Sequence, residues 1–222
     1  KSVIIETLLL FMVIPRKINF TQLERYGKRC EQCYRQTFTK EFDWIRYNME
    51  LMNTLFDRAD RKAIAIDPSY ISKSGKHTPW IGYFWSGCAG QAKRGLEILG
   101  VGAIDIDKRD CVMLKAEQTP DTITLDNVGC TLIDWYLKVL ERIKDRLLEV
   151  SNYVVADAYF SKATFAKGLD SMGFHLVSRL RDDANLMYIH DGQPTGKRGR
   201  PKVHGDKIDF KHLDYTKIQE IE

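Results

Sequence analysis

The chain has 222 residues, which suffices for one large domain or two small ones, and its 44% hydrophobic and 29% charged content is typical of folded globular proteins. This composition excludes general disorder. The formal net charge of +4 is too small to identify a partner, so the placement of the basic residues, which cluster late in the chain, carries more information.

The first apolar run, Val3 to Ile14, contains Glu6 and stops at Pro15. A bilayer-spanning helix needs about 20 residues, so this run predicts a buried helix and no membrane association. It also lacks the small-residue cleavage site of a secretory signal peptide. The chain begins at Lys1 rather than Met and ends within a polar pattern, which suggests a fragment of a longer protein.

The five cysteines are an odd number spread along an ordinary core pattern, which indicates reduced thiols and a cytosolic location. Cys30 and Cys33 form a single CxxC motif without a second one. A zinc site needs four ligands, so we interpret this pair as helix-surface or core thiols.

Residues 1–58 are predicted to form a helical region, with helices over 3–13, 20–26, 29–38 and 43–56. The second and third helices, joined at Gly27, are compatible with a helix-turn-helix motif. Its basic face would comprise Arg25, Lys28, Arg29 and Arg35. A plain helical bundle with a solvated basic face explains the same pattern equally well.

Two short apolar runs further along each end on an aspartate. Residues 63–67 end on Asp67 and residues 153–157 end on Asp157, and both runs have the composition of buried strands. Between them we expect a loop over 68–79, a strand hairpin formed by 96–106 and 111–115, and one long helix that starts at 119–122 and continues to Leu147. After Asp157 we expect a helix over 162–172, capped by Ser161, and a strand over 174–180.

This order of elements predicts an α/β fold of the ribonuclease H-like type. Such a fold has a mixed sheet flanked by helices, and here a small all-helical N-terminal region precedes it. In that topology the first and fourth strands lie side by side, so Asp67 and Asp157 converge at one edge of the sheet. Two unit charges about 4 Å apart repel by about 4 kcal/mol at an effective dielectric of 20, and a divalent cation removes that cost. The alternative is that Asp67 starts a turn, Asp157 caps a helix, and the two never meet.

With these features the chain resembles the DDE-type transposases of bacterial insertion sequences. The resemblance covers nearly the whole chain and depends on the order and spacing of several segments rather than on one motif. These segments are 65–69 with Lys73, Ser74, Gly75 and Lys76, then 85–87, 93–97, 153–160, 176–181, 199–202 and the helical stretch 18–29.

The resemblance implies a DNA transposase that hydrolyses phosphodiester bonds and transfers strands with Mg²⁺, or with Mn²⁺ in its place. It implies that Asp67 and Asp157 are catalytic metal ligands and that a glutamate completes the triad. Tyr215 and Glu222 have the spacing of that third signature by coincidence, because Ile218 occupies the position of the expected arginine. The glutamate is therefore expected downstream, and without it the fragment is expected to be inactive.

The resemblance further implies DNA partners, namely the element ends and the target, a dimer in the DNA complex, and a bacterial cytoplasmic, nucleoid-associated location. It divides the chain into a helical region (1–58) with a possible DNA-binding role, the first part of the catalytic core (59–181), and the start of a basic insertion (182–222).

Eight basic residues are candidate DNA contacts, although a solvated charged surface explains each of them too. Lys73 and Lys76 follow Asp67, and Arg179 and Arg181 follow the last strand of the core. The other four are Lys197, Arg198, Arg200 and Lys202, in a run that is similar to the minor-groove-binding core of the AT-hook. Trp80, Tyr83 and Trp85 are interpreted mainly as core aromatics, with stacking on a base as the alternative.

Two other functions fit the sequence. One is a ribonuclease H-like nuclease that cuts without joining strands. The other is a non-catalytic DNA-binding remnant that uses the helical N-terminus and the basic run.

Overall fold

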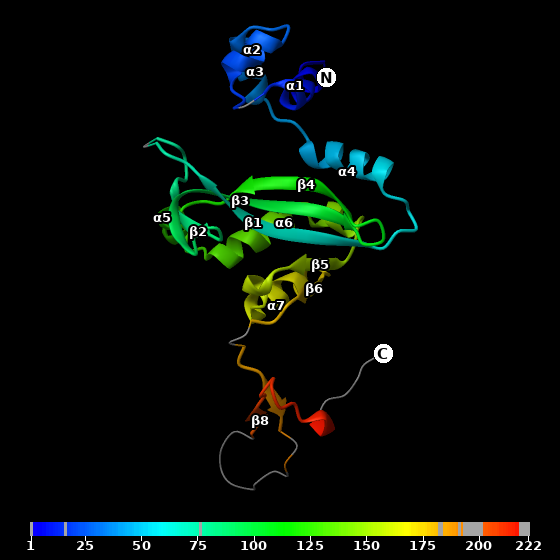
Figure 1. Cartoon of the computed structure of the whole chain (residues 1–222). Helices are drawn as coiled ribbons and strands as arrows, with labels where there is room; N and C mark the ends of the chain where they lie inside the picture. The colour runs from blue at the N-terminus through cyan, green and yellow to red at the C-terminus, as the bar shows by residue number, and fades with distance from the viewer. Residues whose placement is uncertain are drawn as a thin grey trace. The chain divides into compact units, whose positions relative to one another are not determined.

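The computed structural model describes residues 2–15, 17–75, 77–181, 184–190, 192 and 202–217. The chain divides into two compact units, Lys1–Arg58 and Ala59–Glu222 (Figure 1). The roles expected for 1–58, 59–181 and 182–222 stay predictions. No helix among the described residues combines the length and the apolar character that a membrane crossing requires.

The first unit is helical, as predicted. Its helices are α1 (Ser2–Val13), α2 (Phe20–Tyr26), α3 (Glu31–Phe38) and α4 (Trp44–Leu55). Short polar side chains begin two of them: Asn19 Oδ1 accepts from the Gln22 amide at 2.9 Å, and Asp43 Oδ1 accepts from the Arg46 amide at 3.1 Å. The core of this unit consists of Leu10, Ile14, Leu23 and Tyr34.

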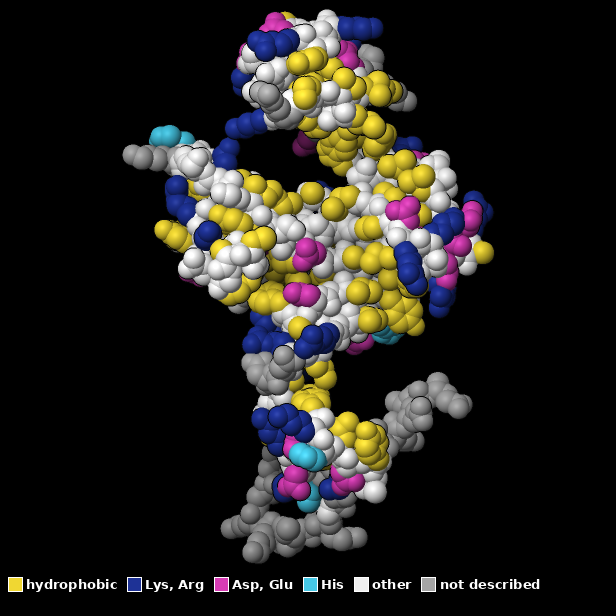
Figure 2. Space-filling model, in the orientation of Figure 1, with side chains coloured by type: hydrophobic (Ala, Val, Ile, Leu, Met, Phe, Trp, Pro, Cys, Tyr) yellow, Lys and Arg dark blue, Asp and Glu magenta, His cyan; other side chains and the backbone are white. Residues whose placement is uncertain are grey.

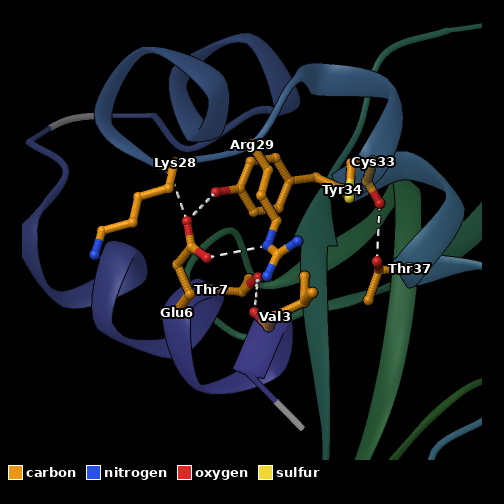
Figure 3. Close-up of polar contacts among 8 residues, drawn as sticks. All are labelled: Val3, Glu6, Thr7, Lys28, Arg29, Cys33, Tyr34 and Thr37. Atoms are coloured by element: carbon orange, nitrogen blue, oxygen red, sulfur yellow. Dashed lines mark hydrogen bonds and ion pairs between the residues drawn. The ribbon is translucent and has the colours of Figure 1, made fainter.

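One carboxylate connects three segments of the helical unit. Glu6 on α1 accepts hydrogen bonds from the Lys28 amide at 2.8 Å, Arg29 Nε at 3.2 Å and the Tyr34 hydroxyl at 2.7 Å (Figure 3). The Tyr34 hydrogen bond, followed by the Lys28 amide, lowers the pKa of Glu6. Burial and then the Glu6 carboxylate raise the pKa of Tyr34 to about 12. Glu6 therefore holds α1 against α3 and the turn that precedes it.

The second unit is built on a six-stranded mixed sheet. Its strands are β1 (Lys62–Ser72), β2 (Gly82–Ser86), β3 (Gln91–Asp105), β4 (Asp110–Gln118), β5 (Tyr153–Ala156) and β6 (His175–Ser178). The order is β2-β3-β1-β5-β6, and β4 also pairs with β3. The pairs β1–β3, β2–β3 and β3–β4 are antiparallel, whereas β1–β5 and β5–β6 are parallel. This arrangement confirms the predicted ribonuclease H-like fold class.

Two details of the sheet differ from the prediction. β1 does not end at Asp67 but continues to Ser72, so the first five residues of the expected loop are strand. Pro68 is tolerated within β1 because β5 pairs with this strand only at Ile64 and Ala65. The rest of the β1 edge that faces β5 makes no ladder hydrogen bonds with it. β2 was not predicted, and it pairs with the first residues of β3 beyond the end of β1.

The helices of the second unit are α5 (Thr122–Asn127), α6 (Leu132–Leu148) and α7 (Ala163–Ser171), with a 3-10 turn, η1 (Ala158–Phe160). The expected single helix from residue 119 is wrong, because Gly129 adopts φ +60° and Thr131 starts a new helix with a reciprocal capping box. Ser161 does not cap α7: Lys162 precedes that helix, and the Ser161 hydroxyl donates to the Ala158 carbonyl at 2.8 Å.

The core of the sheet unit lies between the strands and α6, which Figure 1 places behind them. Tyr136, Leu140 and Leu147 on α6 are fully buried, as are Leu99 and Leu114 on the sheet. A row of rings extends this core, with centroid distances of 5.5 Å between Tyr136 and Phe160 and 4.8 Å between Phe160 and Phe165. The strands that position the aspartates are therefore fixed on a packed scaffold.

The last described residues contain a small two-stranded sheet. Its strands are β7 (Met187–Ile189) and β8 (His204–Lys207), which pair antiparallel, and a 3-10 turn, η2 (Tyr215–Lys217), follows.

Candidate active site

The register of the sheet brings the two predicted aspartates together. β1 and β5 pair in parallel with Ile64 opposite Val154 and Ala65 opposite Val155. Asp67 and Asp157 each lie two residues further on, and neighbouring strands are about 4.8 Å apart. Both aspartates line one cavity of about 800 Å³. The expectation that they converge therefore matches the geometry, whereas their catalytic role is a separate question.

Each aspartate has a carboxylate oxygen that is free of protein hydrogen bonds among the described residues. Asp157 Oδ1 accepts from the Tyr159 amide at 3.0 Å, so Asp157 does cap η1, as the alternative interpretation held. Asp67 Oδ2 accepts a long hydrogen bond of 3.3 Å from the Ser69 hydroxyl. The Ser178 hydroxyl donates to the Asp157 main-chain carbonyl at 2.7 Å and so ties β5 to the end of β6.

The cavity is rich in carboxylates and aromatic rings. Its acidic lining residues are Asp67, Glu97, Asp126 and Asp157, and its only basic lining residue among those described is Arg181. Figure 2 shows acidic side chains in the middle of the sheet unit, surrounded by apolar and uncharged surface. The remaining lining residues are Pro68, Tyr83, Phe84, Trp85, Pro120, Thr122, Leu125, Cys130, Thr131, Leu132, Tyr136 and Tyr159.

The donor set fits a hard divalent cation. Mg²⁺ prefers carboxylate and water oxygens in octahedral geometry and needs few protein ligands. Asp67 and Asp157 supply such oxygens at one cavity, next to space for water and substrate. The excess of carboxylates over guanidinium groups in the lining favours cations electrostatically.

A second group of carboxylates in this unit, Asp60, Asp105 and Asp107, is unrelated to the predicted pair. One oxygen from each lies within 4.8 Å of the others, so the group could hold a metal. It lies at the opposite end of β1, where Lys62 pairs with Asp105. Its charge is already balanced in part, because Arg61 Nη2 contacts Asp107 at 2.7 Å and Lys108 Nζ contacts Asp60 at 3.0 Å.

The predicted DNA-contact residues fall into three groups. Arg181 lines the cavity of the aspartates, while Arg179 is exposed nearby in sequence but does not line it. Lys73, just beyond β1, and Lys202 are exposed on the surface. The other four, Lys76, Lys197, Arg198 and Arg200, lie outside the described residues.

The basic residues of the proposed helix-turn-helix are partly engaged within the protein. Arg29 pairs with Glu6 at 3.2 Å, and Arg35 pairs with Glu31 and covers the ring of Phe20, 4.6 Å from its centroid. These contacts favour the helical-bundle interpretation for the two arginines. All five cysteines are free thiols, and Cys30 directly precedes α3.

The aromatic residues after β1 differ from their predicted use. Tyr83 is 70% exposed and Trp85 is 65% exposed, and both line the cavity, so their interpretation as core residues is wrong. Their positions on β2 alternate with those of the buried Phe84 and Ser86. Trp80 is also exposed, and its ring packs edge-on against Trp135 with ring centroids 6.3 Å apart.

Two further lining residues, Glu97 and Tyr136, were not predicted as site residues. The Tyr136 hydroxyl donates to Glu97 Oε1 at 2.6 Å in a buried hydrogen bond. The detectable signal is an acidic residue within the apolar strand 96–101, at a position that alternation assigns to the same face as Leu99 and Val101.

A ribonuclease H-like sheet that brings one carboxylate within β1 next to another directly after β5 is typical of metal-dependent nucleic-acid enzymes. The family model of the DDE superfamily endonucleases matches residues 23–220, and the chain belongs to this family. A search of curated proteins returned no match.

Two solved structures of the Mos1 transposase are similar to this chain at low identity. One is the paired-end complex with the left transposon end (12% identity, TM-score 0.29), which matches 78% of this chain and 57% of that one. The other is the Mos1 mariner paired-end complex with Mn (11% identity, TM-score 0.28), with 77% and 56% covered. The present chain thus spans little more than half the length of these transposases.

Proposed function

We propose that this chain is the catalytic part of a DNA transposase that hydrolyses phosphodiester bonds and transfers strands with Mg²⁺. The observation that carries the proposal is the presence of Asp67, within β1, and Asp157, directly after the neighbouring parallel strand β5, in one cavity. Membership of the DDE superfamily endonucleases supports the choice of a phosphodiester substrate.

In this proposal the two aspartates bind the catalytic cations through the oxygens that make no hydrogen bond to the described protein. When bound, such cations supply Lewis acidity and align the attacking and leaving oxygens of an in-line displacement. Asp157 keeps its orientation through the Tyr159 amide, and β1 on its packed strand neighbours fixes Asp67. A covalent enzyme intermediate is not required.

Three other residues of the lining contact the nucleic acid in this proposal. Among them Arg181 contacts a phosphate, which is supported by its place in the lining of the same cavity as the aspartates. Tyr83 and Trp85 offer exposed rings on which a sugar or a base can rest. Positive charge elsewhere on the surface comes from Lys73, Arg179 and Lys202. We assign the same DNA-binding role to the other predicted contacts, Lys76, Lys197, Arg198 and Arg200.

Other parts of the proposal concern the whole protein. A glutamate outside residues 1–222 completes the triad, two copies act together on the element ends, and the target DNA enters the same metal centre.

The test compares Asp67→Asn and Asp157→Asn with wild type, first in Mn²⁺ binding followed by electron paramagnetic resonance. Each variant should weaken Mn²⁺ binding by at least about a hundredfold, because loss of an outer-shell partner alone costs about 10–100-fold. Asp170→Asn, at an exposed position of α7, is the matched control and should bind like wild type.

The second readout is cleavage and joining of end-bearing DNA by the longer protein that includes the downstream glutamate. Both aspartate variants should lose Mg²⁺-dependent cleavage. Cleavage by Asp157→Asn at the wild-type rate would overturn the metal-site assignment. Cleavage without joining in the wild type would replace the transposase by a plain nuclease.

A further inference from the structure

Lys162 is a cation beside the cavity of the aspartates that the proposed function does not use. It lies between η1 and α7 and is partly buried. Its Nζ lies 3.9 Å from the centroid of the Tyr159 ring, and Tyr159 lines the cavity. Because the face of an aromatic ring attracts a cation, this contact holds the ammonium group at the cavity wall.

The positive charge of Lys162 is not offset within the described part of the chain. No carboxylate there forms an ion pair with this lysine. Burial and then the Arg181 guanidinium lower the pKa of Lys162, so the charged group that acts on it is itself positive. A partly buried ammonium group near a second cation is unfavourable until an anion approaches.

Arg181 reaches the cavity from the neighbouring strand. β5 and β6 are parallel with Ala156 opposite Ser178, so the segments that follow the two strands leave the same edge of the sheet. The Ser178 hydroxyl ties these ends together, because it donates to the Asp157 main-chain carbonyl at 2.7 Å. Arg181 follows the end of β6 and lines the cavity. Lys162 and Arg181 thus belong to adjoining segments beside the same cavity.

These two cations contrast with the rest of the cavity. Four carboxylates line it within the described part of the chain, and their charge repels a phosphate. A phosphodiester that enters is therefore held where positive charge is concentrated. An ammonium group and a guanidinium group donate several hydrogen bonds to phosphate oxygens and accept none, which suits a phosphate better than the mixed donors and acceptors of a base.

Building on the proposed function, we propose that Lys162 and Arg181 together hold one phosphate of the DNA backbone beside the aspartate pair, and that Tyr159 positions Lys162. The ligand is a backbone phosphodiester of any sequence. Such a contact fixes where the strand lies relative to the aspartates but carries no sequence information. Lys162 is thus a substrate-binding residue, and Tyr159 is its positioning residue.

The experiment measures binding of the full 222-residue chain to two labelled DNA duplexes of unrelated sequence, by fluorescence anisotropy in a chelator at several salt concentrations. Lys162→Gln and Arg181→Gln should each weaken binding about tenfold on both duplexes, as the loss of a hydrogen bond to a charged group does. The salt dependence of log affinity should become shallower by about one unit of slope. Lys167→Gln, exposed on α7, is the matched control and should change neither quantity.

Further variants separate this role from a merely structural one. Lys162→Arg keeps the charge and should keep the affinity. Lys162→Gln combined with Arg181→Gln should lose less than the two single losses multiplied, because both groups hold one phosphate. Tyr159→Leu should weaken binding about threefold, whereas Tyr159→Phe keeps the ring and should bind like wild type. Should Lys162→Gln not fold, the comparison of Tyr159→Leu with Tyr159→Phe decides.

Wild-type affinity and salt dependence in Lys162→Gln would overturn the inference, and so would a loss confined to one of the two duplexes. The proposed function would then survive if Asp67→Asn and Asp157→Asn still lost Mn²⁺. In the reverse case, with DNA binding lost in Lys162→Gln and Mn²⁺ binding kept in both aspartate variants, the phosphate site would stand and the metal centre would fail.

Discussion

Asp67 within β1 and Asp157 directly after β5 occupy equivalent positions in the register of these two parallel strands. The paired residues Ile64 with Val154 and Ala65 with Val155 differ by the same ninety positions that separate the two aspartates. The strand register therefore sets their relative position, and no loop has to fold back to bring them together. A carboxylate pair built on strands is positioned more accurately than one built on loops.

The cap that Asp157 provides for η1 can be separated from its charge. Asp157→Asn keeps an oxygen that can accept from the Tyr159 amide, so its free energy of unfolding should match that of wild type. Asp157→Ala loses this hydrogen bond and should be less stable by about 1 kcal/mol. Urea unfolding followed by circular dichroism measures both, and equal stability of the two variants would argue against the cap.

The sequence predicted the parts of the fold that depend on local patterns. Apolar runs bounded by turns located β1 and β5, and their order with the hairpin led to the mixed sheet. Because a parallel neighbour of β1 follows from that topology, the meeting of Asp67 and Asp157 could be predicted as well. The caps at Asn19, Asp43 and Asp121 agree with the expected helix starts.

The remainder of the site depends on contacts between distant segments. Tyr136 and Glu97 are separated by 39 residues, and no local pattern pairs them. The exposure of Tyr83 and Trp85 follows from the pairing of β2 with β3, which aromatic composition alone does not indicate. An apolar stripe also continued across Gly129, so periodicity joined α5 and α6 where the backbone turns.

The close approach of β1 to Gly95 predicts a sensitive position. A Cβ at Gly95 would lie 2.4 Å from the Ile71 carbonyl oxygen and 2.5 Å from the Tyr70 ring. Gly95→Ala should therefore lower the free energy of unfolding by about 1–3 kcal/mol, as overpacking does. Gly87→Ala is the control, since a Cβ there meets nothing within 4 Å, and it should change stability by less than about 1 kcal/mol. Urea unfolding compares the two, and equal effects would contradict the crowding.

The start of α6 depends on Thr131. Its hydroxyl accepts from the Asp134 amide at 3.2 Å, while Asp134 Oδ2 accepts from the Thr131 amide at 3.0 Å. Thr131→Ala should cost about 1 kcal/mol of stability, and Thr131→Ser should restore most of it because serine caps equally well. The measurement is thermal unfolding of the three chains side by side. No difference between alanine and serine would show that the capping box is unimportant.

The Glu6 carboxylate predicts that the helical unit loses stability in acid. Its pKa is lowered in the folded state, chiefly by the Tyr34 hydroxyl, from an ordinary value of 4.5. A carboxyl group with a lowered folded pKa contributes its full stabilisation above pH 4.5 and loses it as the pH falls through the folded value. Glu6→Gln should remove this part of the pH dependence, whereas Glu24→Gln, exposed on α2, should keep it. Urea unfolding by circular dichroism at several acid pH values makes the comparison.

Tyr34, which donates the hydrogen bond to Glu6, predicts a second loss of stability at alkaline pH. Tyr34 has its pKa raised from 10.0 to about 12 in the folded state, because burial and the Glu6 charge both oppose the phenolate. The unfolded chain releases this proton first, so stability is full below pH 10 and falls as the pH rises toward about 12. Tyr34→Phe should abolish that decline, and it should also lessen the acid dependence, since the main cause of the lowered Glu6 pKa disappears. An unchanged acid profile in Tyr34→Phe would mean that the Lys28 amide and Arg29 suffice to hold the carboxylate.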